Sequence, residues 1–271
     1  MEELKRKEEA LLALIGTMER AAVAYSGGVD STLLAAAAAK ALGRNAVAVT
    51  VRSPTLPAWE QSDADRFAEE IGIRHVILPL SELDDPKFSQ NDGDRCYYCK
   101  KFRFAALASW AEAEGFPWLL EGSNCDDDTD YRPGMRALAE MKGVRSPLME
   151  AGFTKEDVRA LSRAWGLPSW SKPAAACLAS RITYGTPITE RALAQVEEAE
   201  AYLRSLCPAG CQLRVRHHGA IARIEVEREY LPRLAAPEVA QAIHERLTAM
   251  GFSYVTVDLA GYRMGSLNDL L

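Results

Sequence analysis

The sequence lacks the features that mark several common classes of protein. It has no uninterrupted apolar run long enough to cross a bilayer. Residues 1–6 open a charged helical segment, not the apolar core of a signal peptide. Basic residues are in deficit, with 32 Lys and Arg against 38 Asp and Glu and a net charge of -6, whereas an extended nucleic-acid surface usually needs a basic face. We therefore expect a cytoplasmic protein with no membrane segment and no nucleic-acid partner.

The common metal-binding and phosphate-binding signatures are also missing. Cys96 and Cys99 form one Cys-x-x-Cys pair, but no second pair and no pair of histidines completes a zinc site. Neither a Walker A loop nor Gly-x-Gly-x-x-Gly is present. In a cytoplasmic protein, the six cysteines are expected to be thiols or ligands, not disulfides.

What the chain does contain is a glycine loop between a strand and a helix. Apolar residues 21–25 predict a short buried strand, and the Ala- and Leu-rich run 32–42 predicts a helix. Between them lies Ser26-Gly27-Gly28-Val29-Asp30-Ser31. Two adjacent glycines allow a sharp turn whose amides face an anion, and the helix N-terminus adds partial positive charge. The loop predicts a phosphate or pyrophosphate site; the alternative is an ordinary turn capped by Asp30 or Ser31.

Strands and helices alternate through the first two-thirds of the chain. Further strands are predicted at 46–51, 75–80 and 118–122, and helices at 57–71 and 102–114. This alternation indicates βαβ units and a parallel sheet, which binds ligands at the carboxyl ends of its strands. The strand ends near Ser26 and Arg52 would then share one crevice.

The last third predicts a smaller module in the order α-β-β-α-β, with a long helix at 232–250. In its first strand, 212–217, Arg214 and Arg216 point to the same side. Two arginines on one face suit a phosphate or a carboxylate, although an ordinary solvated sheet face has the same pattern. The predicted fold class is α/β, with a parallel-sheet domain at 1–185 and an α+β module at 186–271.

Two further stretches carry groups capable of chemistry. An acidic loop, 123–134, offers the carboxylates that Mg²⁺ prefers alongside phosphates, unless it is merely a solvated loop. Around Cys177 the residues are small, and Lys172 and Arg181 are near enough in sequence to stabilise a thiolate. By composition alone, a buried structural cysteine is the better interpretation of Cys177.

The glycine loop resembles the PP-loop of the ATP pyrophosphatases, which adenylylate a substrate oxygen and release pyrophosphate. Together with the loop 130–134, the stretch 172–182 and the pair Arg214 and Arg216, it makes nearly the whole chain similar to the LarE family. The PP-loop is shared by many families. Among these families, the Cys177 stretch and its distance from the PP-loop favour LarE.

That resemblance implies an ATP-dependent sacrificial sulfur transferase in the synthesis of the nickel-pincer nucleotide cofactor of lactate racemase. ATP would adenylylate a pyridinium biscarboxylic acid mononucleotide, and Cys177 would give up its sulfur and become dehydroalanine. The resemblance also implies Mg²⁺, held in part by Asp30, and a homo-oligomer. Residues 26–31 and Arg52 would bind ATP, while Arg181, Arg214 and Arg216 would bind the substrate.

Other functions remain open from the sequence. Some members of the same family hold a [4Fe–4S] cluster, for which Cys96, Cys99 and Cys177 are possible ligands. A tRNA thiolase also pairs a PP-loop with cysteines, although the acidic pI of about 5.4 argues against it. An amide-forming ligase such as NAD synthetase, and an adenine-nucleotide binding protein without turnover, are the remaining alternatives.

Overall fold

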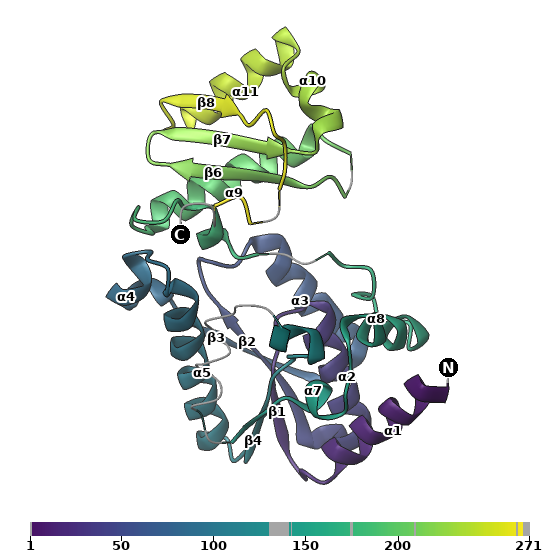
Figure 1. Cartoon of the computed structure of the whole chain (residues 1–271). Coiled ribbons are helices and arrows are strands. Elements are labelled where there is room, and N and C mark those ends of the chain that lie inside the picture. The colour runs from purple at the N-terminus through teal and green to yellow at the C-terminus, as the bar shows by residue number, and fades with distance from the viewer. Residues whose placement is uncertain are drawn as a thin grey trace. The chain divides into compact units, whose positions relative to one another are not determined.

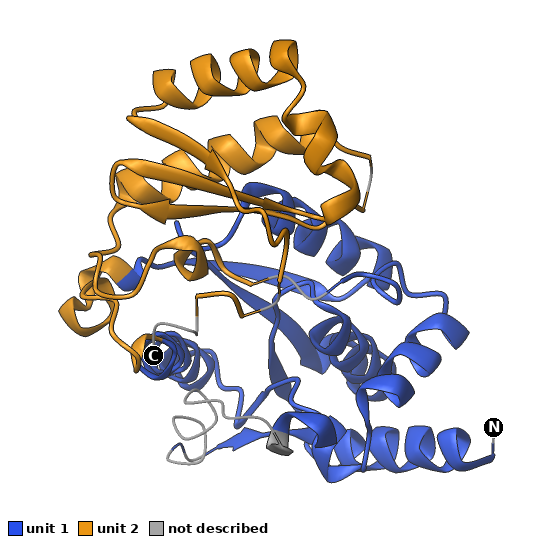
Figure 2. Cartoon of the chain, turned by 45° about the horizontal axis from the view of Figure 1, so that its top comes forward, with its two compact units in different colours: residues 1–82, 96–175 blue, residues 83–95, 176–271 orange. Residues whose placement is uncertain are grey.

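The structure is a computed structural model that describes residues 2–129, 141, 143–173, 176–208, 210–263 and 265–267. The chain forms two compact units (Figure 2). The first comprises Met1–Glu82 and Cys96–Ala175, and the second comprises Leu83–Arg95 and Ala176–Leu271. This packing differs from the predicted division at 185/186, because residues 83–95 and 176–185 pack with the C-terminal elements.

A five-stranded parallel sheet forms the centre of the first unit (Figure 1). Its order is β3-β2-β1-β4-β5, with every neighbouring pair parallel. The strands are β1 (Ala21–Ala24), β2 (Ala46–Arg52), β3 (Arg74–Pro79), β4 (Trp118–Leu120) and β5 (Val144–Arg145). Both faces of β1 and β2 are buried, as the continuous apolar runs in their sequences require. The predicted α/β class with a parallel sheet is confirmed.

Helices cover both faces of this sheet. They are α1 (Glu2–Gly16), α2 (Val29–Leu42), α3 (Ala58–Ile71), α5 (Arg95–Ala113), α7 (Pro147–Glu150) and α8 (Lys155–Ala164). Helices α1, α2, α3 and α8 share one hydrophobic core with β1, while Phe104 and Leu107 of α5 pack on the opposite side against Val47 and Val49. No helix in the described ranges is both long and apolar enough to span a bilayer.

The second unit is a three-stranded sheet with helices. Its sheet has the order β6-β7-β8, from β6 (Leu213–His218), β7 (Ile221–Val226) and β8 (Tyr254–Val257). Its longer helices are α9 (Glu190–Ser205) and α11 (Pro237–Ala249), and α4 (Pro86–Ser89) and α10 (Leu231–Leu234) are short. The predicted single helix at 232–250 is wrong. Pro237 starts α11, because a proline has no N–H to continue the preceding helix.

A buried asparagine anchors the segment that follows Cys177. Asn91 is fully buried, with φ +61°, and its side-chain amide donates to the carbonyls of Thr183 and Thr186 at 2.9 and 2.8 Å. Arg95 donates both to the Asn91 side chain and to the Ala179 carbonyl, at 2.5 and 3.0 Å. Asn91 and Arg95 thereby fix the segment that follows Cys177.

Candidate nucleotide site and sulfur-donor site

The glycine loop lies between β1 and α2, as predicted, and leaves the start of α2 without a side-chain cap. Gly28 occupies the N-cap position, so neither Asp30 nor Ser31 caps the helix there. The two serines close the loop on itself, with their hydroxyls 3.0 Å apart and the Ser26 amide donating to Ser31 Oγ at 3.2 Å. The uncapped first-turn amides of α2, with the partial positive charge of the helix end, suit an anion.

Gly27 is required by its backbone and by its surroundings. Its φ is +71°, and a Cβ at this position would lie 2.8 Å from Ala64 Cα and 2.9 Å from Ala64 Cβ. These are distances that packed carbon atoms do not reach without displacement. The glycine therefore lets α3 pack directly against the glycine loop.

We expect Gly27→Ala to destabilise the protein and weaken ATP binding, because α3 and the loop must move apart. Gly72→Ala is the matched control, since Gly72 has φ +75° with no atom within 4 Å of its Cβ position. The left-handed conformation alone costs an alanine roughly 1–2 kcal/mol. Denaturant unfolding and calorimetric ATP titration should show a larger loss of stability for Gly27→Ala, and a loss of affinity for it alone. Equal effects of the two substitutions would contradict the close-packing argument.

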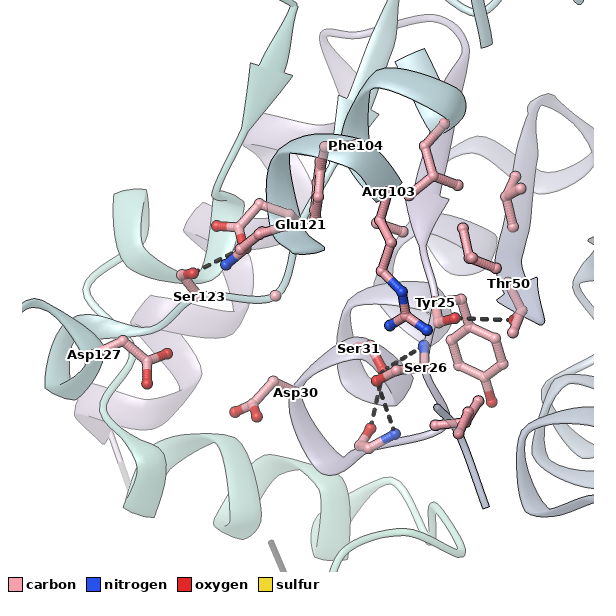
Figure 3. Close-up of a pocket in the computed structure, with 18 residues that line it drawn as sticks. Tyr25, Ser26, Asp30, Ser31, Thr50, Arg103, Phe104, Glu121, Ser123 and Asp127 are labelled. Carbon is pink, nitrogen blue, oxygen red and sulfur yellow. Dashed lines mark hydrogen bonds and ion pairs between the residues drawn. The ribbon is translucent and has the colours of Figure 1, made fainter. Parts of the chain in front are cut away.

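A cavity of about 310 Å³ opens beside the loop (Figure 3). It lies at the carboxyl ends of β1, β2 and β4, where the strand order of the sheet changes direction, the usual ligand position in such sheets. Its apolar lining is formed by Val49, Val51, Leu56, Phe104 and Leu107. Its polar lining is formed by Ser26, Ser31, Lys100, Arg103, Asp30, Glu121, Ser123 and Asp127. A cavity lined by both apolar and polar groups fits a purine base and its phosphates.

Two of the carboxylates that line the cavity are suited to a magnesium nucleotide. Asp30 lies in the first turn of α2, where Oδ1 accepts from the Asn124 side chain at 3.2 Å and Oδ2 pairs with Lys155. Asp127 faces the same cavity (Figure 3). Among the described residues, no group of three or more His, Cys, Asp or Glu could by itself hold a metal. Mg²⁺ that is bound mainly through phosphates needs only one or two carboxylates, so these residues fit that role.

The cavity also contains two cations that the sequence analysis did not single out. Lys100 and Arg103 come from α5 and line the cavity. Arg103 pairs with the buried Glu82 and donates to Ser53 Oγ at 3.3 Å. A signal was present in the sequence, because Lys100 and Arg103 each follow one cysteine of the Cys96/Cys99 pair by four residues and so share its helix faces.

Two other predicted cations pair with carboxylates of α3. Arg52 donates to both oxygens of Asp65, at 2.8 and 2.6 Å. Lys172 lies 2.7 Å from Glu60 and 3.0 Å from Asp63. The predicted roles of Arg52 in ATP binding and of Lys172 in thiolate stabilisation stay predictions. Residues 130–134 of the acidic loop, and 174–175 before the cysteine, lie outside the described residues.

In the second unit, Cys177 is half-buried and immediately precedes a 3-10 turn, Leu178–Arg181. Arg181 is only 2 % exposed, and its Nε and Nη2 donate to the two carboxylate oxygens of Glu200 at 2.8 and 3.2 Å. Its Nη1 donates to the backbone carbonyls of Ala176 and Cys177, at 2.6 and 3.0 Å. The guanidinium thus holds the backbone of the cysteine, a contact that spacing in the sequence did not indicate.

Arg214 and Arg216 are buried, with 7 % and 6 % exposure, so the solvated-face alternative is wrong. Arg216 pairs with Glu225 at 2.8 Å, and Arg214 lies over the Tyr262 ring at 5.2 Å. Burial lowers the pKa of Arg214, and the nearby charge of Arg181 lowers it further. A phosphate or carboxylate beside these guanidiniums would offset both effects.

The buried carboxylate of Glu200 interacts with three arginines in this unit. Burial alone would raise the pKa of Glu200, but Arg181, Arg214 and Arg204 hold it below its usual value. Arg181 and Arg204 pair with it at 2.8 and 3.2 Å. Three positive charges around one negative charge leave an excess that favours a further anion.

The candidate iron–sulfur ligands are divided between the two units. Cys96 and Cys99 lie in the first two turns of α5, in the first unit, where Cys96 is exposed and Cys99 half-buried. Cys177 belongs to the second unit. The cluster alternative stays untested.

The parallel sheet, the uncapped glycine loop and the cavity at the change of strand order define a nucleotide-binding domain of the PP-loop class. The asparagine synthase family model matches residues 17–87, which include β1, the loop, β2 and β3. This class contains enzymes of several activities, so the family is identified by relatives that match the whole chain.

Full-length relatives identify the family. An uncharacterized protein of Synechocystis sp. is 43% identical over 268 residues, 99% of each chain. The pyridinium-3,5-bisthiocarboxylic acid mononucleotide synthase of Lactiplantibacillus plantarum is 40% identical over 272 residues, 100% of this chain and 97% of the synthase. A tRNA-specific 2-thiouridylase of Desulforamulus reducens is 27% identical over 57% of this chain and 53% of its own. The chain belongs to the LarE family of ATP-dependent sulfur transferases.

Proposed function

We propose that this protein converts a carboxylate of pyridinium-3,5-biscarboxylic acid mononucleotide into a thiocarboxylate, with sulfur taken from its own Cys177. The observation that carries the proposal is the match to the synthase over 100% of this chain. Both the PP-loop and the Cys177 stretch lie within that match. The 2-thiouridylase matches little more than half of the chain, which is why a tRNA substrate is disfavoured.

The carboxylate must first be activated, because oxide is a poor leaving group. A carboxylate oxygen of the substrate attacks the α-phosphorus of ATP, which gives an acyl-adenylate and pyrophosphate. The Cys177 thiolate then attacks the acyl carbon, and AMP leaves to give a thioester. Loss of the Cys177 α-proton and cleavage of its Cβ–Sγ bond release the thiocarboxylate and leave dehydroalanine.

In this proposal, the first unit would supply the groups for adenylylation. The loop amides and the α2 N-terminus would hold the pyrophosphate portion of ATP, and the apolar lining of the cavity its base. Lys100 and Arg103 add positive charge to the same cavity. Bound Mg²⁺ would neutralise charge on the phosphates, with Asp30 and Asp127 as its protein ligands.

The choice of acceptor tests this function directly. Pyrophosphate release from Mg·ATP should require the pyridinium mononucleotide and should be accompanied by a thiocarboxylate product detected by mass spectrometry. No pyrophosphate should be released when unfractionated tRNA is the acceptor. None should be released when ammonia is supplied together with a dinucleotide that carries a carboxylic acid. Release driven by tRNA or by ammonia would replace the proposal with a thiolase or an amide ligase. No release with any acceptor would indicate a binding protein.

We expect Arg214→Gln to weaken binding of the pyridinium mononucleotide and to leave ATP affinity unchanged. Loss of one charge-assisted contact costs about 1.5–3 kcal/mol, or roughly 10- to 150-fold in affinity. Arg223→Gln is the control, because Arg223 lies in the same sheet but pairs with Asp258 and Glu225 at 3.2 and 3.0 Å. Calorimetric titration of both ligands measures the effects. Unchanged substrate affinity in Arg214→Gln, and in Arg216→Gln as well, would place the phosphate site elsewhere.

We expect the double variant Cys96→Ser/Cys99→Ser to complete a single turnover at the wild-type rate, since Cys177 alone supplies sulfur in the proposed route. The measurement is thiocarboxylate formed per protein chain in one anaerobic incubation. Iron and sulfide reconstitution, followed by absorbance and Mössbauer spectra, provides the second readout. Multiple turnovers by a reconstituted wild type, lost in the double variant, would favour the cluster route instead.

A further inference from the structure

The backbone carbonyl of Cys177 accepts three hydrogen bonds. Ser180 donates to it twice, through its hydroxyl at 2.7 Å and its amide at 3.0 Å. Arg181 Nη1 is the third donor, at 3.0 Å. The donors and the acceptor all belong to the second unit, which includes residues 176–271.

Capping of the turn explains only one of these bonds. In a 3-10 turn, the carbonyl of the residue before the turn accepts from the amide three residues on, which is the bond from the Ser180 amide. The hydroxyl and the guanidinium are additional donors, and one of them carries a full positive charge. Such a set stabilises a negatively charged oxygen much more than a neutral amide carbonyl.

The donors are also held in place. The two N–H groups of Arg181 Nη1 are shared among the Ala176 carbonyl, the Cys177 carbonyl and Ser180 Oγ, which lies 3.0 Å away. Because Ser180 Oγ accepts from Nη1, its own proton is directed to the Cys177 carbonyl. Glu200 fixes the other edge of the guanidinium through two hydrogen bonds, and accepts from the Val215 amide at 3.1 Å. Both Arg181 and Glu200 are almost fully buried, where a fixed charge acts more strongly than in water.

We propose that Ser180 and Arg181 form an oxyanion site for the enolate that arises when the Cα of Cys177 loses its proton. The inference rests on the proposed function, in which Cys177 becomes dehydroalanine. Ser180 and Arg181 contact a reacting atom and are therefore catalytic residues, while Glu200 is a positioning residue.

The step balances without a redox partner. Sγ of Cys177 carries the acyl group of the substrate as a thioester. A general base takes the proton from Cα, and the electron pair of the C–H bond moves onto the carbonyl oxygen as an enolate. The pair then returns to form the Cα=Cβ bond as the Cβ–Sγ bond breaks, and the sulfur leaves with its electrons as the thiocarboxylate. Because the charge on the oxygen exists only near this transition state, the three donors act selectively on the elimination.

Ser180→Ala tests the proposal with least disturbance, because it removes one donor and leaves the buried ion pair of Arg181 intact. Removal of one donor from an oxyanion site lowers the rate by about 10²–10³-fold. Thioester formation should continue at the wild-type rate, so intact-mass time courses should show a hydroxylamine-sensitive protein–substrate adduct that accumulates before dehydroalanine appears. Ser180→Thr, which keeps the hydroxyl, should restore elimination.

Ser205→Ala is the matched control, since the Ser205 hydroxyl donates to a carbonyl three residues earlier, Tyr202, at 2.6 Å. It should leave both steps unchanged. Protein labelled with [2-²H]cysteine adds a second readout, the deuterium isotope effect on elimination. A purely structural role of Ser180 or Arg181 would not affect this readout. The isotope should slow elimination in Ser180→Ala and in Arg181→Lys, but not thioester formation.

Two results would overturn the inference in different ways. If Ser180→Ala and Arg181→Lys both eliminate at the wild-type rate, the contacts only cap the turn. The proposed function would then still stand. A wild type that forms product with no adduct and no loss of mass would overturn the Cys177 route and, with it, the oxyanion site.

Discussion

Wild-type protein is expected to become lighter by one H₂S after a single turnover with Mg·ATP and pyridinium-3,5-biscarboxylic acid mononucleotide, whereas Cys177→Ser should keep its mass. The loss should map to the peptide that contains Cys177, because breaking its Cβ–Sγ bond leaves dehydroalanine. A thiol added afterwards should form an adduct at that residue, since dehydroalanine accepts nucleophiles. Thiocarboxylate product should be absent with Cys177→Ser, the largest effect of any substitution that we propose.

The serine variant should nevertheless bind ATP and release pyrophosphate when the substrate is present. In the proposed route, adenylylation depends on the PP-loop and its cavity. All lining residues of that cavity belong to the first unit, whereas Cys177 belongs to the second. Cys125→Ser is the matched control, because Cys125 is also half-buried but its Sγ lies 3.7 Å from the Met149 carbonyl. It should form product normally. Product formation by the wild type without any change of mass would show that the sulfur has another source.

Replacement of Asp30 by Asn should abolish pyrophosphate release while the fold stays intact. The substitution keeps the size of the side chain and removes the charge that would hold Mg²⁺ at the start of α2. Loss of one such electrostatic contact at a reacting phosphate should lower the rate by about 10²-fold or more. The pair of Asp30 with Lys155 is partly exposed, at 24% and 37%, and pairs of this kind contribute about 0–1 kcal/mol to stability. Circular dichroism and a thermal melt should therefore be close to those of the wild type.

Lys155→Met separates the two roles of Asp30. It removes the ion-pair partner and leaves the carboxylate, so pyrophosphate release should persist and the Mg²⁺ concentration needed for half-maximal rate should not rise. If Asp30 were only the structural partner of Lys155, both variants would lose activity alike. Near-normal release from Asp30→Asn would exclude a role for its carboxylate in metal binding.

Local sequence was sufficient for the elements that carry the nucleotide site. The apolar run before Ser26 and the alanines after Ser31 predicted β1 and α2, which are found at Ala21–Ala24 and Val29–Leu42. The start of α8 also has its signal in neighbouring residues, since Thr154 and Asp157 form a complete capping box there. In these places the backbone conformation is decided by residues within one helical turn, so periodicity and capping patterns suffice.

Local sequence was less reliable where a proline lies inside an expected helix. One helix was expected at 232–250, but α10 ends at Leu234 and α11 begins at Pro237. The signal for this break, Pro237, was present in the sequence. The error therefore did not depend on tertiary structure.

By itself, the sequence determined the parallel-sheet class and the glycine loop at the start of a helix, because each depends on short-range chemistry. Cys177 became the candidate nucleophile only through the family resemblance, since its local composition favoured a structural cysteine. Only the tertiary structure decided the partners of the charged side chains. It directs Arg181 to Glu200 and to the Cys177 carbonyl, buries Arg214 and Arg216, and brings Lys100 and Arg103 to the cavity. A long side chain can reach several neighbours, and its choice is set by which carboxylates and carbonyls the fold buries beside it, since a buried charge must be paired.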